Sequence, residues 1–182
     1  MYRAGYQRVT ATDETDSNVS GYTSTQIRII GGPYSRIVVL CPGETIAPGT
    51  AEGRTGTATD QSINYSFVVT VQATDQWYNP VTGVTGVMHL TSNDPLAQLP
   101  PDQAMVNGTA QMSMRLSTGG YQQITASNVT RSMPTSTTQV RAIASGFHLE
   151  AEVTPTDVQA GEQFTLTVKV TNDAGSVIQE IN

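Results

Sequence analysis

The residues best suited to metal binding gather in one short segment near the N-terminus. Asp13, Glu14, Asp16 and Asn18 bring four oxygen-bearing side chains together between positions 13 and 18. Hard cations such as calcium take six to eight oxygen ligands, so this cluster is a candidate calcium site. Solvated loop charges explain the same residues without a metal, and the sequence indicates no other cofactor.

Nucleophilic and basic side chains are scarce. Cys41 is the single cysteine, and His89 and His148 are the two histidines. The histidines lie in unrelated segments, and neither forms part of a catalytic motif with the cysteine. The chain also has no Gly-x-Ser-x-Gly elbow, phosphate-binding glycine loop or His-Glu-x-x-His motif. We therefore expect that the chain is not an enzyme, and that Cys41 is a small buried residue at the end of the apolar run 36–40.

Two aromatic residues stand in a segment rich in turn residues. Trp77 and Tyr78 lie between Asp75 and Asn79-Pro80, and such residues favour a turn. An exposed aromatic pair can stack on a sugar ring, so these residues are a candidate carbohydrate contact. A pair packed against the turn itself is the simpler interpretation, with Asp75 capping its own backbone.

Asparagine sequons are a further candidate for chemistry, in this case modification. Asn18, Asn64, Asn107 and Asn128 each begin an Asn-x-Ser/Thr sequence. In a host that glycosylates secreted proteins, these positions would be surface sites. Serine and threonine are so frequent that one or two sequons are expected by chance.

Composition excludes two classes of partner. The 182 residues are only 13% charged, and their formal net charge is −6. A protein that follows a phosphate backbone normally has a basic stripe, which argues against nucleic-acid binding. No apolar run approaches the roughly 20 residues of a membrane-spanning helix. No apolar stretch follows Met1–Gly5, so we do not expect a signal peptide there.

The chain repeats itself. Three pairs of segments match closely, with offsets of 115, 113 and 97 residues. The pairs are Gly5–Ala11 with Gly120–Ala126, Ser24–Ile30 with Thr137–Ile143, and Phe67–Asp75 with Phe164–Asn172. The change in offset indicates roughly 16 extra residues in the middle copy, around 41–62.

The order of the matches predicts three parts. Residues 1–30 correspond to the C-terminal strands of one repeat, 31–143 to a complete repeat, and 144–182 to the N-terminal strands of a third. Glycine-containing linkers at 31–33 and 144–146 mark the joints. The loop of the middle repeat that corresponds to the acidic cluster lacks carboxylates, so the repeat does not require a metal.

Apolar and polar residues alternate with the period of a β-strand. Around the middle of the chain the alternation places Tyr65, Phe67, Val69, Val71 and Ala73 on one face. We predict an all-β fold of tandem immunoglobulin-like β-sandwiches, one complete and flanked by two partial ones. The strands expected in the complete repeat are near 34–41, 65–74, 84–91, 103–106, 110–117, 121–127 and 137–143.

Four blocks carry a family resemblance. They are 67–81, 86–95, 108–112 and 119–126. They resemble the bacterial immunoglobulin-like repeats of large surface proteins, including invasin- and intimin-like adhesins. The insert at 41–62 departs from the shorter members of that group. The resemblance implies an extracellular or cell-surface location and adjacent repeats, of the same or neighbouring chains, as partners.

A mechanical role follows most directly from this organisation. Compact sandwiches with short linkers form a rod that holds something away from a surface. We expect a structural segment of an extracellular or cell-surface protein, acting as the stalk or fibre of an adhesin-type protein whose target would be a surface glycan or protein.

Two alternatives remain open. The chain is a filament subunit joined by strand exchange between neighbouring chains, or it is the ancillary carbohydrate-binding module of a secreted enzyme. Counterparts of residues 82–118 are missing from both flanking fragments, which argues against a full exchange of strands.

Overall fold

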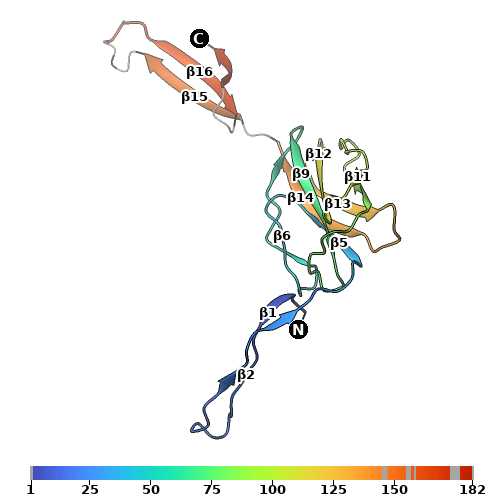
Figure 1. The fold of residues 1–182 in the computed structure, drawn as a ribbon. Helices are drawn as coiled ribbons and strands as arrows, with labels where there is room; N and C mark the ends of the chain where they lie inside the picture. Colours follow the sequence, from blue (N-terminus) through green and yellow to red (C-terminus); the bar gives the residue numbers. More distant parts are fainter. Residues whose placement is uncertain (1, 145–146, 155–156, 158, 173–176, 182) are drawn as a thin grey trace. The chain divides into compact units, whose positions relative to one another are not determined.

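The computed structural model describes residues 2–144, 147–154, 157, 159–172 and 177–181, and these ranges contain strands and turns without a helix (Figure 1). The chain divides into two compact units, Met1–Ala142 and Ile143–Asn182. In the part described, no helix is long and apolar enough to cross a membrane. The predicted linker residues 145 and 146 lie outside the described residues.

Two sheets form the central sandwich. The first has the order β12-β9-β5 and the second the order β11-β10-β13-β14-β8. This is the strand order of an immunoglobulin-like sandwich, so the predicted fold class is confirmed. The strands are β5 (Arg36–Leu40), β8 (Gln61–Ser62), β9 (Ser66–Thr74), β10 (Val87–Ser92), β11 (Gln103–Ala104), β12 (Thr109–Arg115), β13 (Gly120–Asn128) and β14 (Ser136–Ile143).

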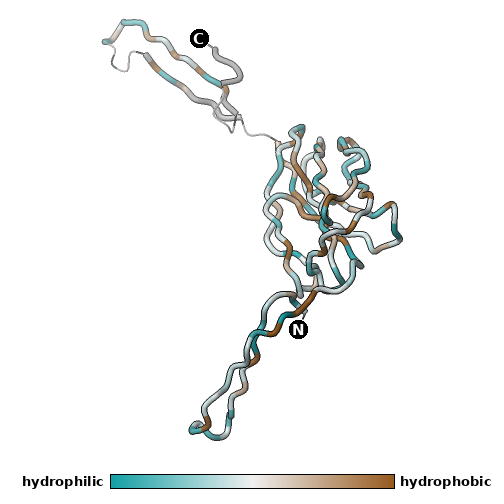
Figure 2. Tube along the Cα trace, in the orientation of Figure 1, coloured by the Kyte–Doolittle hydropathy of each residue, from teal (hydrophilic) through white to brown (hydrophobic). Residues whose placement is uncertain are grey.

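The core lies between these two sheets, and the predicted alternation is visible in it. Phe67, Val69, Val71 and Ala73 of β9 are buried, whereas Val68 points outward and is 46% exposed. In Figure 2 the hydrophobic positions concentrate inside the sandwich. The other buried apolar residues come from both sheets and the loops: Ile37, Val38, Val39, Cys41, Met88, Leu90, Met105, Ala110, Met112, Met114, Leu116, Ile124, Ala126, Val140 and Ala142.

The prediction that Tyr65 shares the inward face of Phe67, Val69, Val71 and Ala73 is wrong. Tyr65 is 58% exposed, because β9 begins only at Ser66. The preceding residue, Asn64, has a left-handed backbone (φ 65°), and this turn interrupts the alternation before the strand starts.

Residues 5–29 form a long antiparallel hairpin. β1 (Gly5–Gln7) pairs with β4 (Ile27–Ile29), and β2 (Thr10–Ala11) pairs with β3 (Tyr22–Thr23). The register slips by one residue between the two ladders. Residues 24–26 stand opposite residues 8–9, so this strand holds the extra residue, and Ser24 Oγ accepts a hydrogen bond from the Val9 amide at 3.0 Å. This segment is called the N-hairpin below.

The N-hairpin repeats the fold of β13 and β14. Tyr6 pairs with Arg28 just as Tyr121 pairs with Arg141. The Thr10 and Thr23 hydroxyls meet at 2.8 Å across the ladder, and a second Thr–Thr pair joins β13 to β14 at the same distance. The internal repeat therefore holds in the pairing of β1 with β4, whereas the β2–β3 ladder is shifted by one residue relative to β13–β14.

The second unit is a single antiparallel sheet in its described residues. Its order is β15-β16-β17, with β15 (Phe147–Thr154), β16 (Thr165–Asn172) and β17 (Val177–Ile181). β15 and β16 pair with each other as β5 and β9 do in the sandwich. β15 begins at Phe147, and the side chain of His148 lies outside the described residues.

The insert at 41–62 is folded onto the sandwich. It contributes the short hairpin β6 (Thr45–Ile46) and β7 (Arg54–Thr55), followed by β8. Glu44 anchors it: one carboxylate oxygen lies 3.2 Å from Arg54 Nε, and the Thr138 hydroxyl of β14 donates to the same carboxylate at 2.8 Å. The sequence did not predict these three short strands, since runs of two residues show no alternation. The predicted division at 30/31 and 143/144 stays a prediction.

Candidate functional site

The turn after β9 joins the N-hairpin to the sandwich, and we call residues 75–80 the joint turn. Asp75 is 1% exposed, and its carboxylate accepts hydrogen bonds from the amides of Gly32, Trp77 and Asn79 at 2.8 to 2.9 Å. The Asn79 side-chain amide donates a fourth at 2.9 Å. Burial by itself raises the pKa of Asp75, but these donors outweigh it and hold the pKa below its ordinary value.

Asn79 holds the other strand of the N-hairpin. Its Oδ1 accepts from the Ala4 amide at 2.7 Å, and its Nδ2 donates to the Tyr2 carbonyl at 2.9 Å. The residue is 4% exposed. Asp75 binds the backbone just after the N-hairpin, and Asn79 binds the backbone just before it. One turn therefore fastens both ends of the preceding element to the sandwich.

Trp77 contributes an aromatic contact to the same joint. The Tyr2 and Trp77 ring centroids lie 4.1 Å apart with an interplanar angle of 36°. The Trp77 carbonyl accepts a hydrogen bond from Gly49 of the insert at 2.7 Å. Trp77 is 42% exposed. Trp77, one of the two residues of the candidate sugar contact, therefore already packs against another aromatic ring of this chain.

Tyr78 faces different partners. Its hydroxyl accepts from Arg36 at 2.9 Å, and the same guanidinium lies 5.3 Å from the ring centroid. Gly53 of the insert packs against the ring so closely that a Cβ there would overlap it. Tyr78 has a left-handed backbone, φ 66°, which a non-glycine residue keeps only where its surroundings hold it. The sugar-binding role of this pair stays a prediction.

The predicted capping by Asp75 is correct, but it is only part of the residue's role. No sequence pattern indicates the contacts with Gly32, Tyr2 and Ala4, which lie 43 to 77 residues away from their partners. The glycine linker and the Asn-Pro step of the turn were the only signals near the joint.

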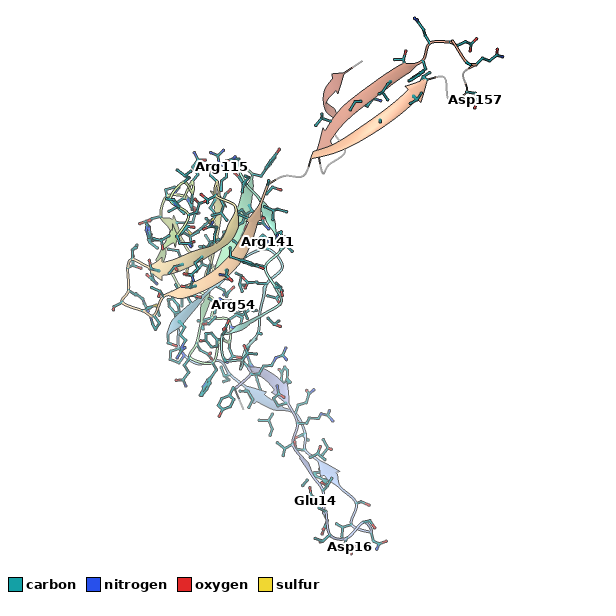
Figure 3. The ribbon with its side chains drawn as sticks, turned by 180° about the vertical axis from the view of Figure 1, so that it is seen from behind. Glu14, Asp16, Arg54, Arg115, Arg141 and Asp157 are labelled. Carbon is teal, nitrogen blue, oxygen red and sulfur yellow. The ribbon has the colours of Figure 1, made fainter. Side chains whose placement is uncertain are left out.

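The candidate calcium cluster lies in the loop of the N-hairpin, where Figure 3 places Glu14 and Asp16. Asp13 Oδ1 accepts from the amide and hydroxyl of Thr15 and from the Asp16 amide. The hydrogen bond from the Thr15 hydroxyl is the main reason that the pKa of Asp13 lies below its ordinary value. Asp16 Oδ1 accepts two bonds from Asn18.

The same turn occurs in the sandwich without a carboxylate. Asn128 Oδ1 accepts from the Thr130 amide and hydroxyl and from the Arg131 amide, matching the bonds that Asp13 makes. Within the described ranges, no three His, Cys, Asp or Glu side chains gather closely enough to hold a metal ion. Calcium binding by Asp13, Glu14, Asp16 and Asn18 stays a prediction.

The four sequons differ in their surroundings. Asn18, Asn64 and Asn107 are exposed, whereas Asn128 is half-buried and its amide donates to the Tyr34 hydroxyl at 2.9 Å. Asn64 and Asn107 both have positive φ, 65° and 51°, and therefore stand in tight turns. Modification at these positions stays a prediction.

The other two candidate reactive residues are Cys41 and His89. Cys41 is buried as predicted, and burial is the main cause that raises the pKa of its thiol to about 12. His89 points outward from β10, and its Nδ1 lies 2.7 Å from Asp102 Oδ1. Cys41 directly follows β5, whereas His89 lies in β10.

No protein-family model and no curated protein matches this sequence. Three solved structures show low similarity. A glycosyl hydrolase family 2 member from Bacteroides cellulosilyticus has a TM-score of 0.45 at 10% identity, covering 77% of this chain and 17% of its own. A Parabacteroides merdae β-glucuronidase gives 0.42 at 10%, covering 78% and 17%. Domains 4–9 of the surface layer protein SbsC give 0.41 at 16%, covering 98% and 25%. The chain spans a quarter or less of each protein.

Proposed function

We propose that this chain is a structural segment of an extracellular or cell-surface protein, in which immunoglobulin-like repeats form a rod. The joint turn carries the proposal. Asp75 and Asn79 fasten the backbone just after and just before the N-hairpin to the sandwich with partly buried hydrogen bonds. A segment that holds another part of a protein away from a surface requires stiffness between repeats, and it requires no reactive centre.

The composition supports the same role. Charged residues are few, and Lys169 is the single lysine. Polar threonine faces and a compact sandwich suit a protein exposed to proteases outside the cell. The proposal assigns no catalysis to the chain, and its partners are adjacent repeats.

Stiffness at the joint is measurable. We expect 15N relaxation to show the N-hairpin and the sandwich tumbling together in the wild type, with the hairpin moving independently after Asn79→Ala. Asn18→Ala removes a similar side chain from the distant hairpin loop and serves as the control. A hairpin that already moves independently in the wild type would contradict the role of the joint.

Location needs its own test. Antibodies raised against the central sandwich should label intact cells of the source organism, and mild protease treatment of those cells should remove the signal. Labelling that requires permeabilised cells would contradict a surface location, whatever the relaxation data show.

A carbohydrate-binding role is the second candidate, favoured by the exposure of Trp77. It has less support, because the Trp77 ring already contacts Tyr2 and the Tyr78 ring contacts Arg36. Binding on a glycan array that disappears in Trp77→Ala, with the joint intact by relaxation, would favour this role.

A further inference from the structure

Each end of the chain exposes apolar residues whose counterparts in the sandwich are buried. On the N-hairpin, Val9 is 47% and Ile27 is 43% exposed. The residues at the same positions of the β13–β14 hairpin, Ile124 and Val140, are 0% and 1% exposed. Among the residues that the structure describes, no second sheet covers this face of the N-hairpin, which corresponds to the inner face of β13 and β14.

The second unit exposes the face that corresponds to the inner face of the β12-β9-β5 sheet. Leu166 is 46% and Val153 is 40% exposed, and the two lie directly opposite each other on one face of the sheet. Their counterparts, Val69 and Cys41, are 0% and 2% exposed, because the β13–β14 sheet covers them. Phe164 is likewise 56% exposed, against 7% for its counterpart Phe67.

β17 completes this half of the sandwich. In the central sheet, β12 pairs antiparallel with β9 on the edge away from β5. β17 pairs antiparallel with β16 on the edge away from β15, and Ile181 lies opposite Val168 as Ala110 lies opposite Val71. β17 therefore takes the place beside β16 that β12 has beside β9 in the central sandwich.

We propose that the N-hairpin of one copy docks on the inner face of the β15-β16-β17 sheet of a second copy. The contact would recreate the packing of β13–β14 against β9–β5 that the central sandwich already shows. Donor and acceptor surfaces are different, so the contact is heterologous and joins copies head to tail. The proposal goes beyond the proposed function, because it concerns how copies join and does not depend on where the protein resides.

The joined unit would lack counterparts of β10 and β11. It would bury less apolar surface than the central sandwich, and we expect association that depends on protein concentration.

Sedimentation velocity over a concentration series tests the proposal. The wild type should form dimers and longer species as concentration rises. Ile27→Glu and Leu166→Glu, which place a charge on the donor and acceptor faces, should each remain monomeric. Gln26→Glu, one residue before β4, and Thr165→Glu, at the start of β16, add the same charge next to these positions on the opposite face and should associate like the wild type.

Mixing the two disruptive variants gives the sharpest result. The Leu166→Glu chain keeps a functional hairpin, and the Ile27→Glu chain keeps a functional sheet. An equimolar mixture should therefore form a dimer that grows no further. Circular dichroism melting of each variant confirms that the sandwich is folded. A monomeric wild type, a mixture that stays monomeric, or equal disruption by the outward controls would overturn the proposal.

Discussion

Buried carboxylates close two turns of the sandwich. Besides Asp75, Asp94 is 4% exposed and accepts hydrogen bonds from the amides of Leu96, Ser117 and Thr118 and from the Thr118 hydroxyl, at 2.7 to 3.0 Å. Burial raises the pKa of Asp94, but these hydrogen bonds outweigh it and lower the pKa to about 2. The ionised form therefore holds the chain between β12 and β13 against the loop after β10.

The first prediction concerns the pH dependence of stability. A carboxylate with a lowered pKa in the folded state contributes stability that is complete above its unfolded value, 3.8, and is lost as pH falls toward 2. Asp94→Asn should lower the free energy of unfolding by roughly 2 kcal/mol at pH 7. The difference from the wild type should shrink as pH falls toward 2, which urea denaturation at several pH values can measure.

Asp157→Asn is the control for this experiment, because it removes a charge from an exposed residue of the other unit. It should leave the unfolding of the sandwich unchanged at each pH. A gap between wild type and Asp94→Asn that stays constant from pH 7 to pH 2 would contradict the role given to Asp94.

The second prediction concerns Cys41. Its thiol is 2% exposed and has a raised pKa of about 12, so the reactive thiolate is both scarce and shielded. We expect a disulfide exchange reagent at pH 8 to react slowly with the native protein and rapidly in denaturant. Equal rates in the two states would show that the end of β5 opens readily.

Among the elements, the long strands follow from the sequence and the short ones do not. β9, β12, β13 and β14 were predicted within a residue or two, because each buries one face and alternates along its length. β6, β7 and β8 have two residues each, and their pairing depends on distant anchors such as Glu44. The joint turn also depends on a distant anchor, because Asn79 binds the backbone of Tyr2 and Ala4. Such backbone contacts leave no pattern of side chains in the sequence, so they could not be predicted from it.

The third prediction tests which face of β9 is buried. Val69 is fully buried, whereas its neighbour Val68 is 46% exposed. Val69→Ala should lower the free energy of unfolding by about 2 kcal/mol, because it removes buried methyl groups and leaves a cavity. Val68→Ala should lower it by well under 1 kcal/mol. Similar losses in the two variants, measured by urea denaturation, would mean that the strand's faces are assigned incorrectly.

The fourth prediction tests the contact between insert and joint turn. Gly53 and Gly83 have similar left-handed backbones, φ 72° and 70°, but only at Gly53 would a Cβ meet another group, the Tyr78 ring. Alanine at either position carries a backbone cost of about 1 kcal/mol. Gly53→Ala should cost roughly 1 to 3 kcal/mol more through overpacking, and it should increase the mobility of the N-hairpin.

Comparison of the two alanine variants separates these effects. Urea denaturation gives the stability difference, and 15N relaxation gives the mobility of the N-hairpin. Equal stability and equal hairpin mobility in both variants would mean that the insert does not brace the joint.

At the scale of the whole molecule, stability should be unequal along the chain. The central sandwich has two covered sheet faces, whereas the N-hairpin and the second unit expose apolar residues such as Ile27 and Leu166. Backbone amides open most easily where few apolar contacts must be broken. In dilute solution we therefore expect hydrogen exchange to be slowest in β9, β12 and β13 and fastest in the two ends.

Our fifth prediction concerns how hydrogen exchange depends on protein concentration. Such a dependence reports association between copies, whereas stiffness within one copy does not change with concentration. If ends of different copies cover each other, protection should rise with protein concentration in β1, β4, β15 and β16 and stay constant in β9. Leu166→Glu should abolish the rise in both ends at once, because the hairpin loses its acceptor when the sheet is altered on a different chain. A rise in only one end would mean that the two surfaces do not bind each other, while the joint turn and its role in the rod would be unaffected.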